Sequence, residues 1–393
     1  MANVSSSNGL EKRPKLRFPG FDEPWAVFRA EELFKNITDK NHPDETVLTI
    51  IQGKGTLPRE QAGRNIHYDD ASLSNYKKVE QGDYIIHLRS FEGGLEMANE
   101  DGIVSPAYTI LRCKKPHSTL FYEAYFHTDE FINHVLSKSV EGIRDGRQIS
   151  YEAFKWLGLP YCNVSEQEKI AQLFYTLNRR IEKQQQMVDA LKKYKRGLLM
   201  HYFSDDKTQL WTQRSISQIG KVITGSTPPT NDRSNYDGDL LFCAPGDVGE
   251  QKYISSTEKR VSPKGFALGR PLPPNSVIVT CIGLIGKLGI AKTCMITNQQ
   301  INALVVSEGF DHEFIYYAFE NFFPEYRSKV SMQTLPILSK SEFEKLMIKV
   351  PDLDVQLKIS SHLSAMDRRI EHTQQELNAL IELRRGIIQQ LFI

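Results

Sequence analysis

The feature that most constrains this chain of 393 residues is an internal repeat. Residues 167–203 align without a gap with residues 356–392, and 14 of those 37 positions are identical. The last aromatic residue of the repeat is Phe203 in one copy and Phe392 in the other. Such a long ungapped match indicates that one structural unit is used twice in the chain.

Each copy of the repeat predicts one long helix of coiled-coil type. Apolar residues recur at alternating spacings of four and three, a mean of about 3.5 residues, and proline is absent from both copies. A helix of this length would run about 55 Å. Polar residues interrupt the apolar stripe at matching places, Gln184 and Lys195 in the first copy and Thr373 and Arg384 in the second. This correspondence favours a geometry that both copies share.

The two helices could pair in more than one way. The ungapped repeat argues against two unrelated core helices, while a coiled coil between separate chains stays an alternative. We favour pairing within the chain because two matching copies are available to each other. Antiparallel pairing would give the molecule a pseudo-two-fold axis with one globular domain at each end.

The segments that precede the two helices begin alike and then diverge. Trp25 and Trp211 are each followed by Lys-x-Ile-Thr, at a constant offset of 186 residues. The chain is therefore predicted to alternate variable and shared parts. The predicted boundaries are 1–160 for an N-terminal arm with the first variable domain, 161–205 for the first helix, 206–350 for the second variable domain, and 351–393 for the second helix.

Both variable domains have the pattern of α+β folds with mixed sheets. Runs rich in β-branched residues and bounded by turn residues predict strands, and longer apolar runs predict a helix in each domain. The expected strands are Val47–Ile51, Asp83–Leu88, Ala107–Arg112, Val277–Ile282 and Ile301–Val306, and the expected helices are Leu120–Leu136 and Phe314–Phe323.

Charge and cysteine content limit the functional classes. The net charge is +1, which argues against a general polyanion binder that works alone. Residues 1–160 hold 20 basic and 23 acidic side chains, whereas residues 161–203 hold 8 and 4, so a partner is expected to supply part of any phosphate contact. The five cysteines are scattered and predict reduced thiols in a cytoplasmic protein. No apolar run is long enough to span a membrane.

Sequence motifs of catalysis are absent. Gly283–Leu288 lacks the loop length and the hydroxyl residue of a phosphate-binding P-loop. There is no G-x-G-x-x-G, no Asn-Pro-Pro-Tyr-like loop for a target amine, and no His/Cys cluster with zinc spacing. The chain is therefore expected to have no catalytic site, no metal and no cofactor of its own.

A series of short motifs, together with the repeat, resembles the specificity (S) subunit of type I restriction-modification systems. Two departures are Thr38–Pro43 in place of Gly-x-Thr-Pro after the first tryptophan, and Val355-Gln356 in place of Glu-Gln. The resemblance covers nearly the whole chain. The motifs are Pro14–Pro19 followed by a Trp, Gly102–Tyr108, Gly142–Arg144, Pro160–Ile170 with Glu166-Gln167, Gly225–Pro228, Asn298–Ile301 and Ile348–Pro351.

The resemblance implies an α+β fold with two mixed-sheet target-recognition domains joined by two long antiparallel coiled-coil helices. It implies a non-catalytic subunit that reads one half of a bipartite, non-palindromic DNA target with each domain. The helices would dock two methyltransferase (M) subunits, which bind S-adenosylmethionine. Two restriction (R) subunits would use ATP and Mg to translocate and cut DNA. Reading heads on one face of B-DNA must lie about 34–36 Å apart or a multiple of it, a separation that helices of the predicted length can hold.

Three alternatives remain at this point. The equivalent subunit of a type IIB-like system shares the architecture and differs in its partner. A coiled-coil scaffold that binds proteins and no DNA would lack a footprint on DNA. A self-sufficient methyltransferase would bind S-adenosylmethionine as an isolated chain.

Basic and amide side chains in loops are the candidates for DNA contact, because Arg and Lys pair with guanine and Asn and Gln with adenine. For any one of them a solvated surface charge is the competing interpretation. Asn298-Gln299-Gln300 could read adenine or satisfy buried backbone groups, and Trp25 and Trp211 are expected in the core. The candidates are Lys54, Arg59, Arg64, Lys77, Arg89, Arg144 and Arg147 in the first domain, with Lys54 and Lys77 on phosphates, and Lys252, Arg260, Lys264, Lys287 and Gln333 in the second.

Overall fold

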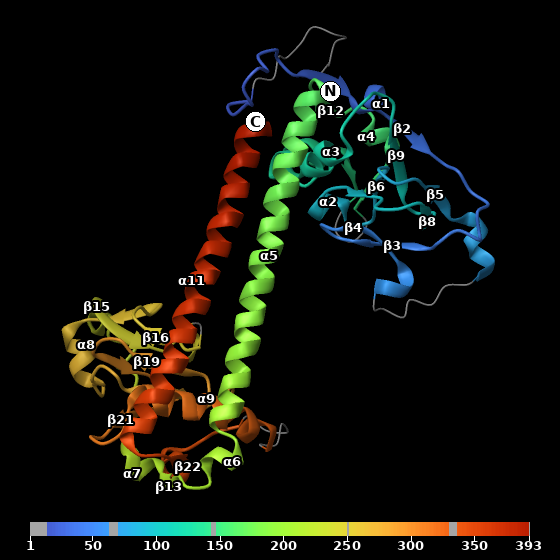
Figure 1. Ribbon diagram of the computed structural model, residues 1–393. Coiled ribbons are helices and arrows are strands. Elements are labelled where there is room, and N and C mark those ends of the chain that lie inside the picture. The colour runs from blue at the N-terminus through green and yellow to red at the C-terminus, as the bar shows by residue number, and fades with distance from the viewer. Residues whose placement is uncertain (1–13, 63–69, 143–146, 250, 330–335, 393) are drawn as a thin grey trace. The chain divides into compact units, whose positions relative to one another are not determined.

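The computed structural model describes residues 14–62, 70–142, 147–249, 251–329 and 336–392. The chain divides into two compact units (Figure 1). Unit 1 comprises residues 1–185 and 376–393, and unit 2 comprises residues 186–375. Helix α5 (Val164–Tyr202) and helix α11 (Leu353–Phe392) each give part of their length to both units. The prediction of two long helices is thus confirmed.

Unit 1 is built on a four-stranded antiparallel sheet in the order β2-β9-β6-β7, with two-stranded ribbons around it. The sheet strands are β2 (Phe34–Ile37), β9 (Thr109–Cys113), β6 (Tyr84–Ile86) and β7 (Glu96–Met97). The ribbons pair β1 (Ala26–Arg29) with β12 (Gly158–Tyr161), β3 (Leu48–Ile51) with β4 (Gly55–Pro58), β5 (Lys77–Val79) with β8 (Gly102–Val104), and β10 (Val140–Glu141) with β11 (Gln148–Ile149). The helices are α1 (Ala30–Leu33), α2 (Ser90–Gly93), α3 (Thr119–Phe126) and α4 (Tyr151–Phe154).

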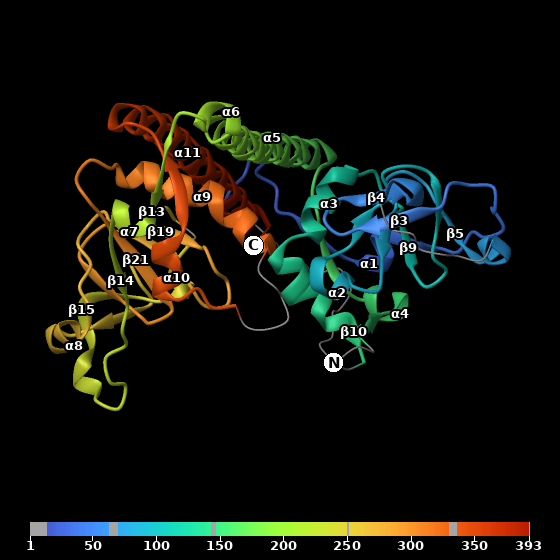
Figure 2. The same ribbon diagram turned by 90° about the horizontal axis from the view of Figure 1, so that it is seen from below.

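Unit 2 contains a five-stranded sheet in the order β14-β21-β18-β19-β16 and a three-stranded sheet in the order β17-β15-β20 (Figure 2). β15–β20 and β16–β19 are parallel pairs, so these sheets are mixed. The strands are β13 (Thr212–Ser215), β14 (Gly220–Thr224), β15 (Tyr236–Cys243), β16 (Tyr253–Ile254), β17 (Lys259–Val261), β18 (Val277–Thr280), β19 (Leu288–Ala291), β20 (Met295–Thr297), β21 (Ile301–Val306) and β22 (Met347–Val350). The helices are α6 (Asp205–Thr208), α7 (Ile216–Ile219), α8 (Pro263–Leu268), α9 (His312–Lys329) and α10 (Lys340–Lys345).

Most predicted elements are present, and the α+β class is confirmed. The expected helix 120–136 is interrupted, because α3 ends at Phe126 and a π-helical turn follows over Glu130–Val135. Thr128 causes the break: its hydroxyl donates to the Tyr125 carbonyl at 2.7 Å and accepts from the Phe131 amide at 3.0 Å. A hydroxyl that bonds locally in this way competes with the helical ladder.

The same helix cap occurs in both copies of the repeat. In unit 1 buried Gln167 donates to the Cys162 carbonyl at 2.8 Å and accepts from the Ser118 amide at 3.0 Å. In unit 2 buried Gln356 donates to the Pro351 carbonyl at 2.8 Å and accepts from the Asp311 amide at 2.9 Å. Each glutamine thus ties the start of a long helix to the domain that precedes it.

The terminal phenylalanines of the repeat pack on equivalent aromatic groups. In unit 1 the ring of Phe392 lies 5.9 Å from Trp25 and 5.5 Å from Phe121. In unit 2 the ring of Phe203 lies 5.8 Å from Trp211 and 5.6 Å from Phe314. Trp25 is buried and Trp211 half-buried, so both tryptophans act as the predicted core anchors.

Within each unit the two long helices run antiparallel. In unit 1 Gln184 donates to Glu376 at 2.8 Å, and Phe174 stacks on Phe392. In unit 2 Lys195 pairs with Asp367 at 2.7 Å and the Tyr202 hydroxyl bonds His362 at 2.6 Å. The predicted two-fold axis concerns how the units are related and stays a prediction.

Two of the polar interruptions of the apolar stripe, Lys195 and Arg384, connect the long helices to the rest of their units. Lys195 in α5 forms ion pairs with Asp367 at 2.7 Å and with Glu320 of α9 at 2.9 Å. At the matching position of α11, half-buried Arg384 interacts electrostatically with Glu123 of α3. Burial lowers the pKa of Arg384, and the Glu123 carboxylate opposes that shift. In each unit a cation in the seam therefore faces a glutamate of the domain's helix.

Candidate nucleic-acid interface

The tip of the β3–β4 hairpin holds the first of the predicted contacts of unit 1. Lys54 is exposed there, and its ammonium makes no ion pair or hydrogen bond within the part of the chain that the structure describes. Its neighbours Gly53 and Gly55 have positive φ values of 75° and 78°. A Cβ on Gly55 would lie 2.5 Å from the Met97 carbonyl oxygen, so this position requires glycine.

The other basic candidates of unit 1 have different environments. Arg89 is exposed immediately before α2, and exposed Arg147 has its guanidinium 4.2 Å from the centroid of the Phe91 ring. Half-buried Arg59 lies 6.0 Å over the Tyr76 ring, in a 3₁₀ turn after β4. Arg64 and Arg144 lie outside the described residues, so their predicted roles stay predictions.

Lys77 is used inside the fold. Its ammonium donates to the Tyr108 carbonyl at 2.5 Å, and burial, followed by the nearby charge of Lys40, lowers its pKa. A half-buried ammonium that is already bound to a carbonyl is poorly placed to meet a phosphate. We therefore leave Lys77 out of the proposed interface.

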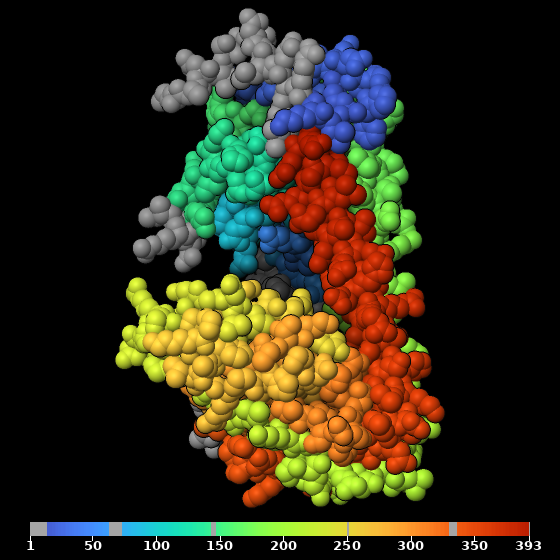
Figure 3. Space-filling model, turned by 90° about the vertical axis from the view of Figure 1, so that its left-hand side faces the viewer, coloured from blue at the N-terminus to red at the C-terminus, as the bar shows by residue number. Residues whose placement is uncertain are grey.

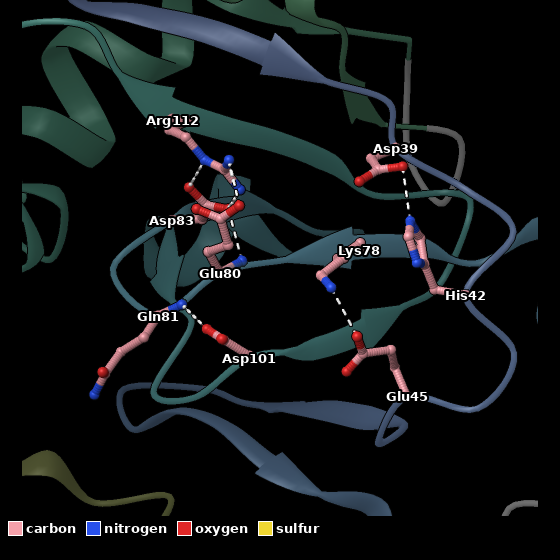
Figure 4. Close-up of polar contacts among 9 residues, drawn as sticks. All are labelled: Asp39, His42, Glu45, Lys78, Glu80, Gln81, Asp83, Asp101 and Arg112. Carbon is pink, nitrogen blue, oxygen red and sulfur yellow. Dashed lines mark hydrogen bonds and ion pairs between the residues drawn. The ribbon is translucent and has the colours of Figure 1, made fainter.

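A further face of unit 1 has its cations neutralised by carboxylates (Figure 4). Arg112 of β9 donates to both oxygens of buried Asp83 at 2.8 and 2.7 Å and to Glu80 at 2.7 Å. The hydrogen bonds that Arg112 donates to Asp83 raise the pKa of Arg112 against the effect of burial. Lys78 pairs in the same way with Glu45 at 2.7 Å. Carboxylates repel phosphates, so these contacts fix loops and do not form a DNA-binding face.

In unit 2, one loop collects polar side chains from several elements. It covers residues 225–235 between β14 and β15, and it lies in the yellow-green region of the exposed surface in Figure 3. Thr227 donates to exposed Gln299 at 2.5 Å, exposed Arg270 donates to the Thr224 carbonyl at 2.9 Å, and exposed Lys264 pairs with Asp232 at 2.7 Å.

Gly225 lets this loop approach the sheet, because a Cβ there would lie 2.1 Å from the Asn298 carbonyl oxygen. The two roles considered for the Asn298–Gln300 motif, adenine reading and local hydrogen bonding, fall to different residues. The Asn298 side chain accepts from the Gln300 amide at 3.0 Å and donates to the Gln300 side chain at 3.2 Å, so it shapes the turn. Gln299 was considered as an adenine reader through its motif but was not among the candidate contacts, and Arg270 was not predicted at all.

Lys252 does not belong to this exposed set. Its ammonium pairs with Glu313 at 3.1 Å and donates to the Tyr317 hydroxyl at 2.9 Å and the Ser364 hydroxyl at 2.8 Å. The lysine side chain is only 11% exposed, and burial lowers its pKa although Glu313 opposes the shift. This network ties α9 of unit 2 to α11, so the Lys252 ammonium is engaged inside the fold.

The remaining candidates of unit 2 are scattered. Arg260 is exposed on β17, and Lys287 is half-buried just before β19. Gln333 lies outside the described residues. The structure thus brings Lys264 to the 225–235 loop with Gln299 and places the other predicted residues elsewhere.

The described residues hold no group of three or more His, Cys, Asp or Glu side chains arranged to bind a metal ion. All five cysteines are free thiols. Within the same described ranges, none of the helices combines the length and apolar character that a membrane crossing requires.

Comparison with known proteins shows the class. The profile of the type I restriction modification DNA specificity domain matches residues 209–383. The resemblance predicted from the sequence is confirmed.

Particular relatives agree with this class. The specificity subunit of the type I restriction enzyme MjaIX from Methanocaldococcus jannaschii is 30% identical over 189 residues, 47% of this chain and 44% of that protein. The type I S subunit structure from M. genitalium covers 97% of this chain and 99% of its own, with a TM-score of 0.63 and 14% identity. A structure from a study of assembly of the type I restriction-modification system covers 96% and 99%, with a TM-score of 0.57 and 16% identity. The two solved structures share the fold, while the sequence match spans less than half of the curated relative.

Proposed function

We propose that this chain is the DNA-specificity subunit of a type I restriction-modification complex. It would recognise a bipartite, non-palindromic target, reading one half with each unit, and it would carry out no chemistry itself. The matched specificity domain at residues 209–383 and the fold shared over nearly the whole chain support this proposal.

The observation that carries the proposal is a duplicated framework with different loops. Two features repeat from unit to unit. One is the helix cap made by Gln167 or Gln356. The other is the packing of Phe392 or Phe203 against a tryptophan. The exposed loops do not repeat, since unit 1 presents Lys54 on a hairpin and unit 2 presents the 225–235 loop. Two units that share a framework but expose different loops favour recognition of two different half-sites.

The long helices are the proposed docking sites for partner subunits. Their exposed surface carries large apolar side chains that a partner subunit could cover, among them Met187, Tyr194 and Met200 on α5 and Ile381 and Leu383 on α11. Two methyltransferase subunits with S-adenosylmethionine would dock there, and two restriction subunits with ATP and Mg would complete the complex. The low net charge of +1 is consistent with partners that contribute phosphate contacts.

A methylation map tests the proposal. The chain is co-expressed with its methyltransferase partner in a host without adenine methylation, and genomic DNA is sequenced for N6-methyladenine. A single split motif that disappears when this chain is omitted is the expected result. An assembled complex that leaves the DNA unmethylated would overturn the proposal and favour a protein scaffold instead.

A further inference from the structure

The tip of the β3–β4 hairpin is held from beneath by a buried carboxylate. The two oxygens of Glu96, on β7, accept the Gly53 amide at 2.7 Å and the Gly55 amide at 2.9 Å. These two amides flank Lys54, whose own amide donates to the Ile51 carbonyl at 2.9 Å. Glu96 is 0% exposed, so its charge serves the interior of the unit.

The carbonyl side of the same turn is held as well. Asn99 donates through its side chain to the Lys54 carbonyl at 2.8 Å and to the Thr56 carbonyl at 2.9 Å. The backbone before, at and after Lys54 is therefore fixed by hydrogen bonds, while the lysine side chain remains exposed. A rigid backbone that carries an exposed cation suits the binding of an anion, because little conformational entropy is lost when the anion binds.

The protonation of the supporting groups follows from the geometry. His127 has one ring nitrogen 2.8 Å from the Glu123 carbonyl oxygen and the other 3.2 Å from Glu96. A carbonyl only accepts, so Nδ1 carries a proton, and a carboxylate that accepts two backbone amides favours a second proton on Nε2. The pKa shifts agree: burial disfavours both charges, yet the contact between the two groups raises the pKa of His127 and, with the glycine amides, lowers that of Glu96.

Other charged groups that face this cluster leave the assignment intact. Burial lowers the pKa of His87, which disfavours its charged form, and burial raises the pKa of Glu123. Among the described residues, Arg384 of α11 interacts electrostatically with Glu123, and Arg89 with His87. The ionised partner of His127 within the cluster is thus Glu96.

We propose that Glu96 is a positioning residue for DNA binding: it holds the Gly53–Gly55 turn in the conformation that presents Lys54 to a backbone phosphate. The inference rests on the proposed function and names one residue that supports it. Lys54 would be the group in contact with DNA, and Glu96 would act through Lys54 alone.

Salt dependence of DNA binding by the full chain with its methyltransferase partner tests this inference. The slope of log K against log salt becomes shallower by about 0.9 for each phosphate that the protein no longer neutralises. Lys54→Ala, a surface change that leaves the fold intact, is expected to make the slope shallower by that amount. Glu96→Gln keeps the shape but places an amide NH₂ opposite a glycine amide, and it is expected to change the slope equally. The exposed Glu92→Gln variant, with the same charge change, is the matched control and should keep the wild-type slope.

A double-mutant cycle separates positioning from general destabilisation. If Glu96 acts through Lys54, the variant with both changes shows no larger reduction of slope and affinity than Lys54→Ala alone. Additive reductions, or a Glu96→Gln variant with the wild-type slope, would overturn the inference. A wild-type complex with no salt-dependent DNA binding would instead refute the proposed function, so the two failures are distinguishable.

Discussion

Replacing Lys195 by methionine should destabilise unit 2 more than any exposed charge change on the same helix. Lys195 is 13% exposed and neutralises two carboxylates, those of Asp367 at 2.7 Å and Glu320 at 2.9 Å. Breaking a buried ion pair on one side costs about 3–5 kcal/mol, because the remaining charge stays buried without its partner. Since Glu320 is 31% exposed, we expect the lower end, about 3 kcal/mol.

Urea unfolding of the full chain, with hydrogen exchange to locate the change, measures this effect. Amides of α9 should lose protection in Lys195→Met, while the exposed Lys193→Met control should stay within about 0.5 kcal/mol of wild type. Adding Glu320→Gln to Lys195→Met should recover part of the stability, because one unpaired carboxylate is removed. A Lys195→Met variant as stable as the control would refute the assignment of Lys195 as the buried counter-ion.

The pH dependence of the same variant has a defined sign. In the wild type, burial lowers the pKa of Lys195 but Glu320 and Asp367 raise it overall, so its contribution is present below about 10.5 and declines as pH rises through the folded value. Burial already raises the pKa of Glu320, and removing Lys195 would raise it further. A folded state that binds more protons than the unfolded state gains stability on acidification. Lys195→Met should therefore recover stability as pH falls through the raised folded pKa of Glu320 toward the ordinary glutamate value of about 4.3.

Three further outcomes follow from other contacts. Lys252→Met should lower stability yet leave the salt slope of DNA binding unchanged, because its ammonium serves the Glu313 network; salt titration checks this. Cys294 should react with iodoacetamide far faster than the buried thiols in the native protein, because it is exposed, as peptide mapping would show. Gln167→Leu should cost about 1–3 kcal/mol in urea unfolding, because it leaves the Ser118 amide and the Cys162 carbonyl without their partner.

The sequence was most informative where one local period governs the structure. The 3.5-residue stripe predicted both long helices, and the runs Val277–Ile282 and Ile301–Val306 became β18 and β21. The sequence also showed that Lys195 and Arg384 interrupt the apolar stripe at matching positions of the two copies. Their glutamate partners were not, because Glu320 lies 125 residues from Lys195 and nothing local connects them.

Prediction was weakest for residues whose role depends on tertiary contacts. The local sequence does not distinguish Lys252 from Lys54, because each is a lysine near predicted strand and turn residues. Folding buries Lys252 against Glu313 and leaves Lys54 exposed on a hairpin tip. The role of Glu96 could not be predicted from the sequence. Its contacts with Gly53 and Gly55 form only when β7 packs against a turn that lies 41–43 residues earlier in the chain.

Under the proposed function, the arrangement would explain how a nearly neutral chain binds a polyanion selectively. Cations that serve the fold, such as Lys252 and Arg112, are matched by carboxylates within the same unit, so they add little to the external field. Exposed cations on backbones fixed by hydrogen bonds, such as Lys54, remain for the ligand. In the proposed complex, a few such contacts would set the register on DNA without strong binding to every sequence, and the loops that read bases would decide which sequence is bound.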